Sequence, residues 1–425
     1  MGTWTTEKLH RLCSIRIGGT PARSNPLYWD TAKNGTNLWA SIKDLRNHVV
    51  EETEERITNA GVRHSNAKLV KKGTVLLSFK LTIGRVAFAG RDLYTNEAIA
   101  ALETDQIDQN FLYYGLQHWN LLVGVDQAIK GTTLNKEKLA NIEAHLPVSR
   151  DEQSKIANIL STVDRAIEQT EALIAKHQRI KTGLMQDLLT RGIDEHDRLR
   201  DPAIHRFKPS PLGGVPDCWD VVGLEHALLE IDAGKSPNCP DEPAGPNEWG
   251  VLKVSAIEPT GFRPDENKRV LNTNFVNPAY EVKHGDLLFS RSNTYELVGL
   301  VCLVRTPPSR LMLCDKTLRL RVQPNRAVTE FIFSVLSSPM ARRQIEIYAT
   351  GSSGSMKNIS QKSIKKLTIP LPPVPEQEKI CEVIGGSTDQ LAALRMTLAK
   401  LRRFKTGLMQ DLLTGKVSVE PLLET

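Results

Sequence analysis

The sequence predicts an α+β protein built as a pseudo-two-fold tandem repeat, in which each of two α/β globules is followed by one long helix. Three observations predict this class. The ten residues KTGLMQDLLT occur twice, 224 positions apart, at 181–190 and 405–414. Apolar residues recur at spacings of three and four along the segments around both copies, as in amphipathic helices. The regions before these segments contain short β-rich runs broken by Gly, Pro and Asn.

Length and composition limit the class of protein. A chain of 425 residues exceeds the usual size of one core, so two or more domains are expected. With 40% hydrophobic and 24% charged residues it is neither disordered nor membrane-like in composition. No run approaches 18 apolar residues and the start, MGTWTTEKLHRL, lacks an apolar signal core, which predicts a cytoplasmic protein. The net charge of +6 fits a nucleic-acid binder, although many cytosolic proteins carry as much.

The first repeat is predicted to comprise a globule at 1–148 and a helix at 149–192. The globule has strand-like runs at 74–79 and 85–89 and a helical stretch at 110–125. Glu152, in the first turn of the long helix, complements the helix dipole, and Gly192 is a plausible stop residue.

The second repeat follows a charged, proline-containing linker at 193–216. Its globule is predicted at 217–373, its long helix at 374–415 and a tail at 416–425. Within the globule, strands are predicted at 287–290, 297–304 and 317–322, and a helix at 329–348.

Both long segments carry the apolar spacing of a coiled coil over about five heptads. The predicted seam consists of Ile156, Leu160, Val163, Ile167, Ile174, Leu184 and Leu188 in the first helix, and Ile380, Ile384, Leu391, Leu394, Leu398, Leu401, Leu408 and Leu412 in the second. Two such helices in one chain can pair antiparallel as a rod of roughly 60 Å with a globule at each end. Since duplex DNA is also two-fold symmetric, this architecture is suited to holding two sites on one duplex, with the rod setting their spacing.

Some polar and small residues interrupt the helical pattern. Gly183 and Gly407 each lower the stability of a helix by about 1 kcal/mol relative to alanine at the same position. They are either tolerated irregularities or places where another helix, of this chain or of a partner, approaches closely. His177, Lys181 and Lys405 interrupt the seam, and they either set its register or face a partner.

Taken together, these motifs resemble the specificity subunits of type I restriction-modification enzymes. The resemblance covers essentially the whole chain. Its most specific parts are the helix starts with Glu-Gln at 152–153 and 376–377 and the helix end GLMQDLLTG; Trp-x4-Leu at 4–9 and 219–224 marks each globule. One departure is Gly234-Lys-Ser-Pro237, where the first globule has Gly19-Thr-Pro21, so loop contacts need not transfer one for one.

The resemblance implies a non-catalytic subunit whose globules are target-recognition domains for a bipartite, gapped DNA sequence. Implied partners are double-stranded DNA, two modification (methyltransferase) subunits and ATP-dependent restriction subunits. The resemblance implies no cofactor in this chain. S-adenosylmethionine would belong to the methyltransferase, which methylates adenine, and ATP and Mg²⁺ to the restriction subunit.

DNA contacts are expected from Arg, Lys, Asn, Ser and Thr in polar or Gly-flanked positions. The candidates in the first globule are Arg16, Thr20, Arg23, Lys43, Lys80, Arg85, Lys130, Thr132 and Thr133; those in the second are Lys235, Ser236, Lys253, Ser255, Arg291, Ser292, Asn293, Ser352, Ser353 and Lys357. Loops 130–133 and 351–357 each shortly precede a long helix, which favours a common role.

Docking of the modification subunits is expected on helix faces turned away from the seam. The candidates are Gln153, Lys181, Gln186 and Asp187, with their counterparts Gln377, Lys405, Gln410 and Asp411.

Motifs for catalysis or metal binding are weak. The run Asn277-Pro-Ala-Tyr280 resembles the Asn-Pro-Pro-Tyr motif of amino methyltransferases, but its third residue differs and no glycine-rich cofactor loop lies nearby. Asp241 and Glu266 have the loose spacing of a metal-dependent nuclease, but both fall in turns. The six cysteines contain no C-x-x-C pair, and no histidine spacing suits a metal. The alternatives to a specificity subunit are therefore a coiled-coil scaffold and a self-contained methyltransferase or nuclease.

Overall fold

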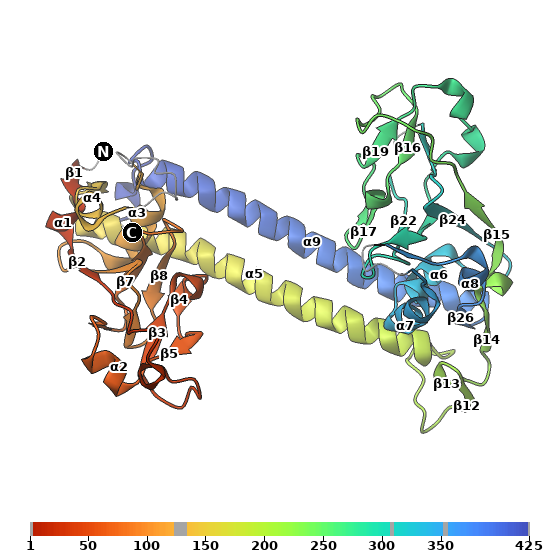
Figure 1. Cartoon of the computed structure of the whole chain (residues 1–425), viewed down its shortest axis with the longest axis horizontal. Coiled ribbons are helices and arrows are strands. Elements are labelled where there is room, and N and C mark those ends of the chain that lie inside the picture. The colour runs from red at the N-terminus through yellow and green to blue at the C-terminus, as the bar shows by residue number, and fades with distance from the viewer. Residues whose placement is uncertain (1–2, 123–133, 307–309, 352–355, 424–425) are drawn as a thin grey trace. The chain divides into compact units, whose positions relative to one another are not determined.

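The computed structural model describes residues 3–122, 134–306, 310–351 and 356–423, and it divides into two compact units. The first unit comprises Met1–Ala172 with Arg395–Thr425, and the second comprises Leu173–Leu394. Two long helices, α5 (Arg150–Thr190) and α9 (Val374–Leu412), each contribute one part to each unit (Figure 1).

The described part of the first unit's globule is built from short strands with four short α-helices. Its elements are β1 (Trp4–Lys8), α1 (Leu9–Leu12), β2 (Ser14–Ile17), β3 (Leu38–Ala40), η2 (Ile42–Asp44), β4 (Val49–Val50), β5 (Glu55–Arg56), α2 (Asn59–Arg63), β6 (Leu69–Val70), β7 (Val75–Ser78), β8 (Val86–Ala89), β9 (Leu93–Thr95), β10 (Ile99–Glu103), α3 (Gln109–His118), α4 (Lys136–Ala140) and β11 (Glu143–Pro147). They form a five-stranded sheet β2-β10-β7-β8-β4, a four-stranded sheet β5-β3-β9-β6 and the pair β1-β11.

The central strand β7 explains why its sequence is a continuous apolar run. Val75 and Leu77 belong to the cluster that includes α3, whereas Leu76 belongs to a second cluster with residues of β3 and β9. Both faces of the strand are buried, so polar residues do not alternate with apolar ones.

The globule of the second unit repeats this plan. Its elements are β12 (Phe207–Ser210), β13 (Gly213–Pro216), β14 (Asp220–Gly223), η3 (Leu224–Ala227), β15 (Leu228–Ala233), β16 (Gly250–Leu252), η4 (Val254–Ala256), β17 (Ile257–Glu258), β18 (Gly261–Phe262), β19 (Asn267–Arg269), η6 (Pro278–Tyr280), β20 (Leu287–Ser290), β21 (Ser292–Asn293), β22 (Val301–Leu303), β23 (Leu311–Met312), β24 (Thr317–Val322), α6 (Thr329–Leu336), α7 (Pro339–Tyr348), β25 (Lys357–Asn358), α8 (Gln361–Lys365) and β26 (Thr368–Leu371). The order β15-β24-β20-β22 repeats β2-β10-β7-β8, and β14-β26 repeats β1-β11. The parallel pair β16–β23 likewise repeats β3–β9.

Four local predictions differ from the structure. The strand expected over 297–304 is confined to β22, Val301–Leu303. The stretch 193–216 contains the hairpin β12–β13, so it is more ordered than a simple linker. The helix expected over 329–348 is two helices, because Pro339 begins α7 with Ser338 as its N-cap. The helix expected over 110–125 ends at His118, with Trp119 in an extended conformation at its C-cap.

The ends of the predicted coiled-coil seam pack into the globules. Ile156 and Leu160 of α5 join the core of the first unit, as do Leu412 of α9 and the adjacent Leu413. In the second unit the same role falls to Ile380, Ile384, Leu188 and Leu189. The outer parts of the periodic apolar pattern therefore complete the cores of the globules and do not form a helix-to-helix seam.

Each long helix is followed within three residues by a glycine with positive φ, as the sequence predicts for Gly192. Gly192 has φ +66° and Gly415 has φ +71°, the left-handed conformation that ends helices. Gly192 donates its backbone N–H to the carbonyl of Leu188 at 3.1 Å.

Each globule is fastened to the helix that follows it by a buried glutamine. The amide of Gln153 accepts from the backbone N–H of Asp108 and donates to the carbonyl of Pro147, both at 2.8 Å. The amide of Gln377 accepts from Val328 at 2.9 Å and donates to Pro372 at 2.8 Å. Both side chains are buried, so they are unsuited to the docking role predicted for them.

None of the helices within the described residues is long and apolar enough to cross a bilayer.

Candidate nucleic-acid interface

A glycine loop is held in equivalent ways in the two units. The Gly19 N–H donates to the carbonyl of Thr95 at 2.8 Å, and the Gly234 N–H donates to that of Cys314 at 3.2 Å. Thr20, one residue after Gly19, donates its hydroxyl to the carboxylate of Glu97. Ser236, two residues after Gly234, donates its hydroxyl to the carboxylate of Asp315. The contacts transfer between the repeats despite the sequence difference.

Neither glycine has room for a side chain. A Cβ on Gly19 would lie 2.5 Å from the carbonyl carbon of Asn66, and one on Gly234 would lie 1.8 Å from the carbonyl oxygen of Leu313. The loops are therefore packed tightly against the scaffold, which positions the residues beside them.

The polar loops before the long helices are flanked by the same contact in both units. The N–H of Leu134 donates to the carbonyl of Phe79 at 3.1 Å, and the N–H of Ile359 donates to that of Arg291 at 3.0 Å. Each acceptor directly follows Ser78 or Ser290, the last residue of a central strand. The predicted readers within these loops, Lys130, Thr132, Thr133, Ser352 and Ser353, lie outside the described residues.

Equivalent hairpins follow these central strands but carry different residues. Gly84 (φ +91°) and Gly299 (φ +81°) donate to the carbonyls of Ser78 and Ser290, at 2.9 and 2.7 Å. The residue after the glycine is Arg85 in the first unit and Leu300 in the second. The backbone is thus repeated while the side chain has diverged.

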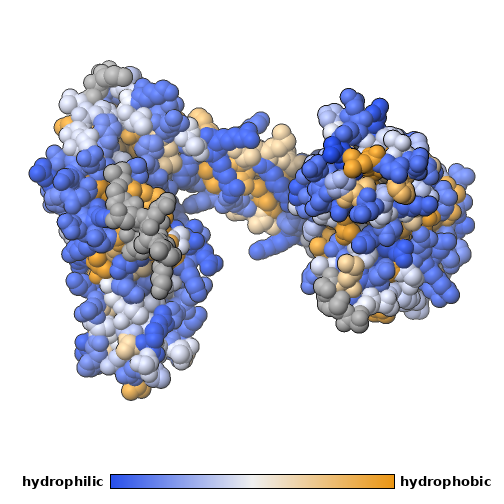
Figure 2. All heavy atoms as spheres, turned by 45° about the horizontal axis from the view of Figure 1, so that its top comes forward, coloured by the Kyte–Doolittle hydropathy of each residue, from blue (hydrophilic) through white to orange (hydrophobic). Residues whose placement is uncertain are grey.

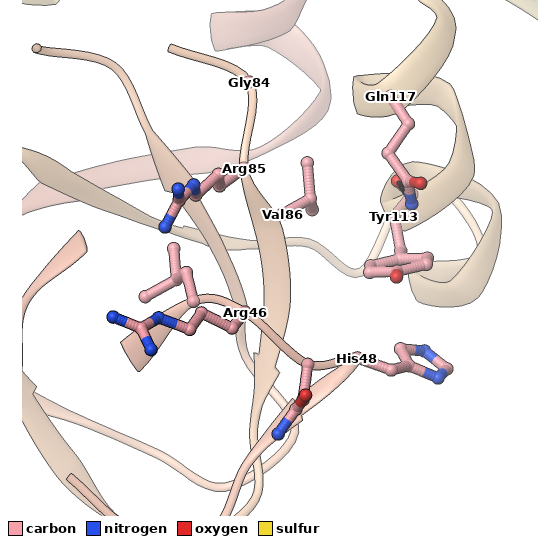
Figure 3. Close-up of a pocket in the computed structure, with 9 residues that line it drawn as sticks. Arg46, His48, Gly84, Arg85, Val86, Tyr113 and Gln117 are labelled. Carbon is pink, nitrogen blue, oxygen red and sulfur yellow. Dashed lines mark hydrogen bonds between the residues drawn. The ribbon is translucent and has the colours of Figure 1, made fainter. Parts of the chain in front are cut away.

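Arg85 lines a hollow of about 450 Å³ in the first unit. The lining residues, which define this basic hollow, are Leu45, Arg46, Asn47, His48, Gly84, Arg85, Val86, Tyr113 and Gln117. Figure 3 shows the guanidinium groups of Arg46 and Arg85 toward one side and His48, Tyr113 and Gln117 toward the other. A guanidinium N–H of Arg85 donates to the carbonyl of Ile42 at 3.1 Å, which orients the side chain.

The aromatic side of the basic hollow is neutral. The ring of His48 lies 4.5 Å from that of Tyr113, centroid to centroid, and burial lowers the pKa of His48 below its usual value. Its Nε2 is buried without a hydrogen-bond partner in the described residues. Burial likewise raises the pKa of Tyr113 to about 12, so its phenol is uncharged at neutral pH.

Two other predicted contacts in the first unit are engaged by carboxylates. Arg16 pairs with Glu103 across β2 and β10. Arg23 pairs with Glu55 through both terminal nitrogens, and its guanidinium carbon lies 3.8 Å from the centroid of the Trp29 ring. This hydrogen bond and charge raise the pKa of Arg23 and lower that of Glu55.

Three other lysines that were predicted to contact DNA differ in how exposed their side chains are. Lys43 and Lys235 are exposed, and Lys80 is half-buried with its ammonium 5.4 Å from the centroid of the Phe79 ring. In the second unit Lys253 pairs with Asp241 at 3.0 Å, and the hydroxyl of Ser255 donates to Glu266.

The candidates beside the second polar loop form a small sheet. Ser292 and Asn293 of β21 pair with Asn358 and Lys357 of β25. Arg291 donates to the side-chain oxygen of Asn358 at 3.3 Å, and the Lys357 ammonium donates to the carbonyl of Gly351 at 2.7 Å. Ser292 is buried, which makes it a poor candidate for direct DNA contact.

Comparison with known proteins places this architecture in a family. The profile of the type I restriction modification DNA specificity domain matches residues 1–176 and 263–394, more than half of the chain. The chain belongs to this family.

Individual relatives agree with the resemblance seen in the sequence. The EcoEI specificity subunit of Escherichia coli is 34% identical over 172 residues, covering 40% of this chain but only 29% of the relative. The MjaVIII specificity subunit of Methanocaldococcus jannaschii is 24% identical over 389 residues, covering 88% and 86%. The crystal structure of a type I S subunit from M. genitalium has the same fold, with a TM-score of 0.58 at 15% identity over 97% of this chain and 96% of that one.

Among the residues of this family member predicted to dock partners, Gln186 and Gln410 are exposed. Asp187 is paired with Arg191 at 3.8 Å, and Asp411 with Lys416 at 3.4 Å. Lys181 is partly buried and interacts within the chain.

Lys405 has a different role from the docking role predicted for it. Its ammonium lies 2.7 Å from the Asp164 carboxylate in the first unit, and both side chains are mostly buried. The Tyr114 hydroxyl donates to the same carboxylate at 2.8 Å. Lys405 therefore ties α9 to α5 and to the globule, in agreement with the alternative that it sets the register.

The catalytic motifs have structural explanations. Asn277 caps η6, because its side-chain oxygen accepts from the N–H of Ala279 at 3.0 Å. Asp241 pairs with Lys253 and Lys268, which lowers the pKa of its carboxyl. Among the described residues, no group of three or more His, Cys, Asp or Glu side chains is placed to hold a metal ion.

Three polar residues of the basic hollow, Arg46, Asn47 and Gln117, were missed by sequence reasoning. Arg46 and Asn47 follow η2, and Gln117 lies near the end of α3, about 70 positions further along the chain. The run Arg46-Asn47-His48 was a usable polar signal, but only the fold brings it to Arg85.

Proposed function

We propose that the chain is the non-catalytic specificity subunit of a type I restriction-modification system, which reads a bipartite, gapped DNA target with one globule for each half. The observation that carries this proposal is the repeated scaffold, which carries different side chains in the two units, such as the exposed Lys235 that only the second glycine loop contains. Two copies of one backbone with different surface chemistry suit the reading of two different half-sites.

The proposed arrangement pairs α5 with α9 antiparallel, so that the helices set the distance between half-sites. Contacts in the first unit support this direction, since Asp164 meets Lys405 while the later residue Glu171 meets the earlier residue Arg402. The approximate two-fold symmetry of the repeat would then match that of the duplex.

Exchange of one globule tests the reading of half-sites. The chain is co-expressed with its modification subunit, and methylated adenines are mapped across the host genome. We expect one gapped motif, and replacing residues 1–148 with those of another family member should change one half of it only. A change in both halves, or methylation independent of this chain, would contradict the proposal.

For docking of the modification subunits we propose a surface present once on each long helix. This docking stripe consists of Arg179, Ile180, Gly183 and Gln186 on α5 and of Arg403, Phe404, Gly407 and Gln410 on α9, and all eight residues are exposed. Figure 2 shows hydrophobic residues on the surface of the long helices, and Ile180 and Phe404 are about half exposed. Identical spacing in both helices suits two copies of one partner.

The helix glycines support this docking stripe. A Cβ on Gly183 or Gly407 would meet nothing within 4 Å among the described residues, so packing inside its own unit does not explain either glycine. Each lies one turn after the exposed Ile180 or Phe404, which leaves a notch beside an apolar side chain.

Substitution of the notch tests the docking stripe. The double variant Gly183→Leu/Gly407→Leu should co-purify with fewer modification subunits, and each single variant should lose one of the two. Met396→Leu, at an exposed apolar position of α9 outside the docking stripe, is the control. Retention of both subunits by the double variant would place docking elsewhere.

The restriction subunit would join this assembly and supply ATP and Mg²⁺, and S-adenosylmethionine would be held by the modification subunits. A self-contained methyltransferase or nuclease would instead bind S-adenosylmethionine or cleave DNA with Mg²⁺ as the purified chain alone. A scaffold would assemble the complex without selecting any DNA sequence.

A further inference from the structure

We propose that the basic hollow of the first unit receives a backbone phosphate of the DNA and does not read a base. The inference rests on the proposed function and assigns one type of contact to one site. Specificity proteins need phosphate contacts to fix their register on the duplex as well as base contacts to read it.

The charge of the basic hollow favours an anion. Its lining contains two arginines, an asparagine and a glutamine, and no carboxylate. Among the described residues, no carboxylate oxygen lies within ion-pairing distance of Arg46 or Arg85. This distinguishes them from Arg16 and Arg23, whose charges are already balanced by Glu103 and Glu55.

Of the two acidic groups near His48, Asp164 is already paired. Asp164 and Glu168 of α5 are near enough to affect the pKa of His48. The carboxylate of Asp164, however, is paired with Lys405 at 2.7 Å and accepts from Tyr114 at 2.8 Å. The lining itself carries the positive charge of two arginines and no carboxylate.

Shape separates a phosphate contact from a base contact. Base edges lie inside the grooves, so the side chains that read them must project from the protein surface. The phosphodiester ridge is convex, and a concave site lined by guanidinium and amide groups accepts it. Arg85 is held back by its hydrogen bond to the carbonyl of Ile42, a geometry that suits a positioning contact.

The second unit does not repeat this chemistry. Leu300 stands at the position of Arg85 and packs against a core cluster of the second unit. Loss of the basic hollow should therefore remove the phosphate contact from one half of the complex only.

The test uses the complex with modification subunits and a duplex that carries the motif methylated by the wild-type complex. Fluorescence anisotropy is measured over a series of KCl concentrations for wild type, Arg46→Gln and Arg46→Gln/Arg85→Gln. The logarithm of the affinity falls linearly with the logarithm of the salt concentration, and each lost phosphate contact makes this negative slope less steep by about 1. We expect Arg46→Gln to weaken binding by at least about tenfold at low salt, with the methylated motif unchanged.

Arg46 is the key position, because its exposed side chain forms no ion pair with a carboxylate among the described residues. Circular dichroism checks the fold of the double variant, which also loses the hydrogen bond from Arg85 to the carbonyl of Ile42. Arg11→Gln, at an exposed arginine of the same unit outside the basic hollow, is the matched control. Relaxed specificity in one half of the motif would overturn the phosphate assignment in favour of a base contact. An unchanged salt slope would show that DNA does not enter the basic hollow. A wild-type complex that selects no gapped motif would overturn the proposed function itself.

Discussion

Gly192 and Gly183 lie nine positions apart in the chain and are constrained in opposite ways. Gly192 has φ +66°, and a Cβ there would lie 2.3 Å from the Trp219 ring and 2.1 Å from Oε1 of Glu376. Gly183 lies within α5, and a Cβ there would meet nothing within 4 Å. Burial and backbone conformation, rather than residue type, therefore decide the effect of substitution.

We predict that Gly192→Ala lowers the free energy of unfolding by more than about 2 kcal/mol, because strain and steric overlap add. Gly183→Ala should raise it by up to about 1 kcal/mol, because a helix-interior glycine is replaced without a clash. Urea denaturation of both variants measures the two effects. A stabilised Gly192→Ala variant would show that this helix end differs from the one described.

Two glutamates at matching positions of the repeat have unequal partners. Glu376 accepts from the backbone N–H of Ile193 at 3.0 Å, from the Trp219 indole at 3.1 Å and from Arg200 through both terminal nitrogens. Glu152 is 4% exposed, and its Oε2 has no partner among the described residues. Burial accordingly raises the pKa of Glu152 above its usual value.

We predict that Glu376→Gln destabilises the second unit by roughly 3 kcal/mol, because Arg200 loses its buried partner. Glu152→Gln should be neutral or stabilising. Between the usual pKa of a glutamate and the raised value in the folded chain, the folded state retains a proton that the unfolded state releases. The free energy of unfolding contributed by Glu152 therefore falls as pH rises through that window.

Thermal unfolding of wild type and Glu152→Gln from pH 4 to 7 measures this dependence. The difference between the two proteins should grow in favour of Glu152→Gln as pH rises. A difference that does not vary with pH would mean that Glu152 has a partner in solution.

At the scale of elements, α5 and α9 are joined in the first unit by a buried ion pair and an exposed one. The side chains of Lys405 and Asp164 are 20% and 14% exposed, whereas those of Arg402 and Glu171 are 62% and 45% exposed. An exposed pair contributes little because water and salt screen it, whereas a buried carboxylate left alone is costly.

We predict that Lys405→Met lowers the free energy of unfolding by up to about 3 kcal/mol, and that Arg402→Met changes it by less than about 1 kcal/mol. The methionines keep most of the side-chain volume, so chemical denaturation of the two variants compares the charges. Equal effects would contradict the role of Lys405 in setting the register.

At the scale of the whole molecule, we propose that α5 and α9 set the distance between the two half-sites. Seven residues add about 10 Å to a helix at 1.5 Å per residue. Because base pairs rise about 3.4 Å each, a heptad inserted into both helices should lengthen the gap in the methylated motif by about three base pairs.

Methylation mapping of the doubly lengthened chain checks this prediction. Both half-sites should keep their base sequences, since the insertion leaves the globules intact. An unchanged gap in an active complex would show that something other than the helices sets the spacing.

The sequence by itself determined the repeat, the two long helices and the family. Helix periodicity, the glycine stops and the duplicated KTGLMQDLLT are local signals that need no knowledge of packing. The candidate DNA and partner contacts were predicted from residue type, and residue type alone does not show which side chains lie next to one another in the fold. Gln153 and Lys405 looked like surface residues, yet one is buried against backbone groups and the other pairs with Asp164.

Only the tertiary structure decided which charges are already balanced and which polar side chains meet. It paired Arg16 and Arg23 with carboxylates distant in sequence, and it brought Arg46, from one turn, beside Arg85, from a hairpin. The physical reason is that ion pairs and hollows depend on distances between segments set by sheet pairing and core packing. Such distances leave no periodic trace in a single sequence, whereas helices and repeats do.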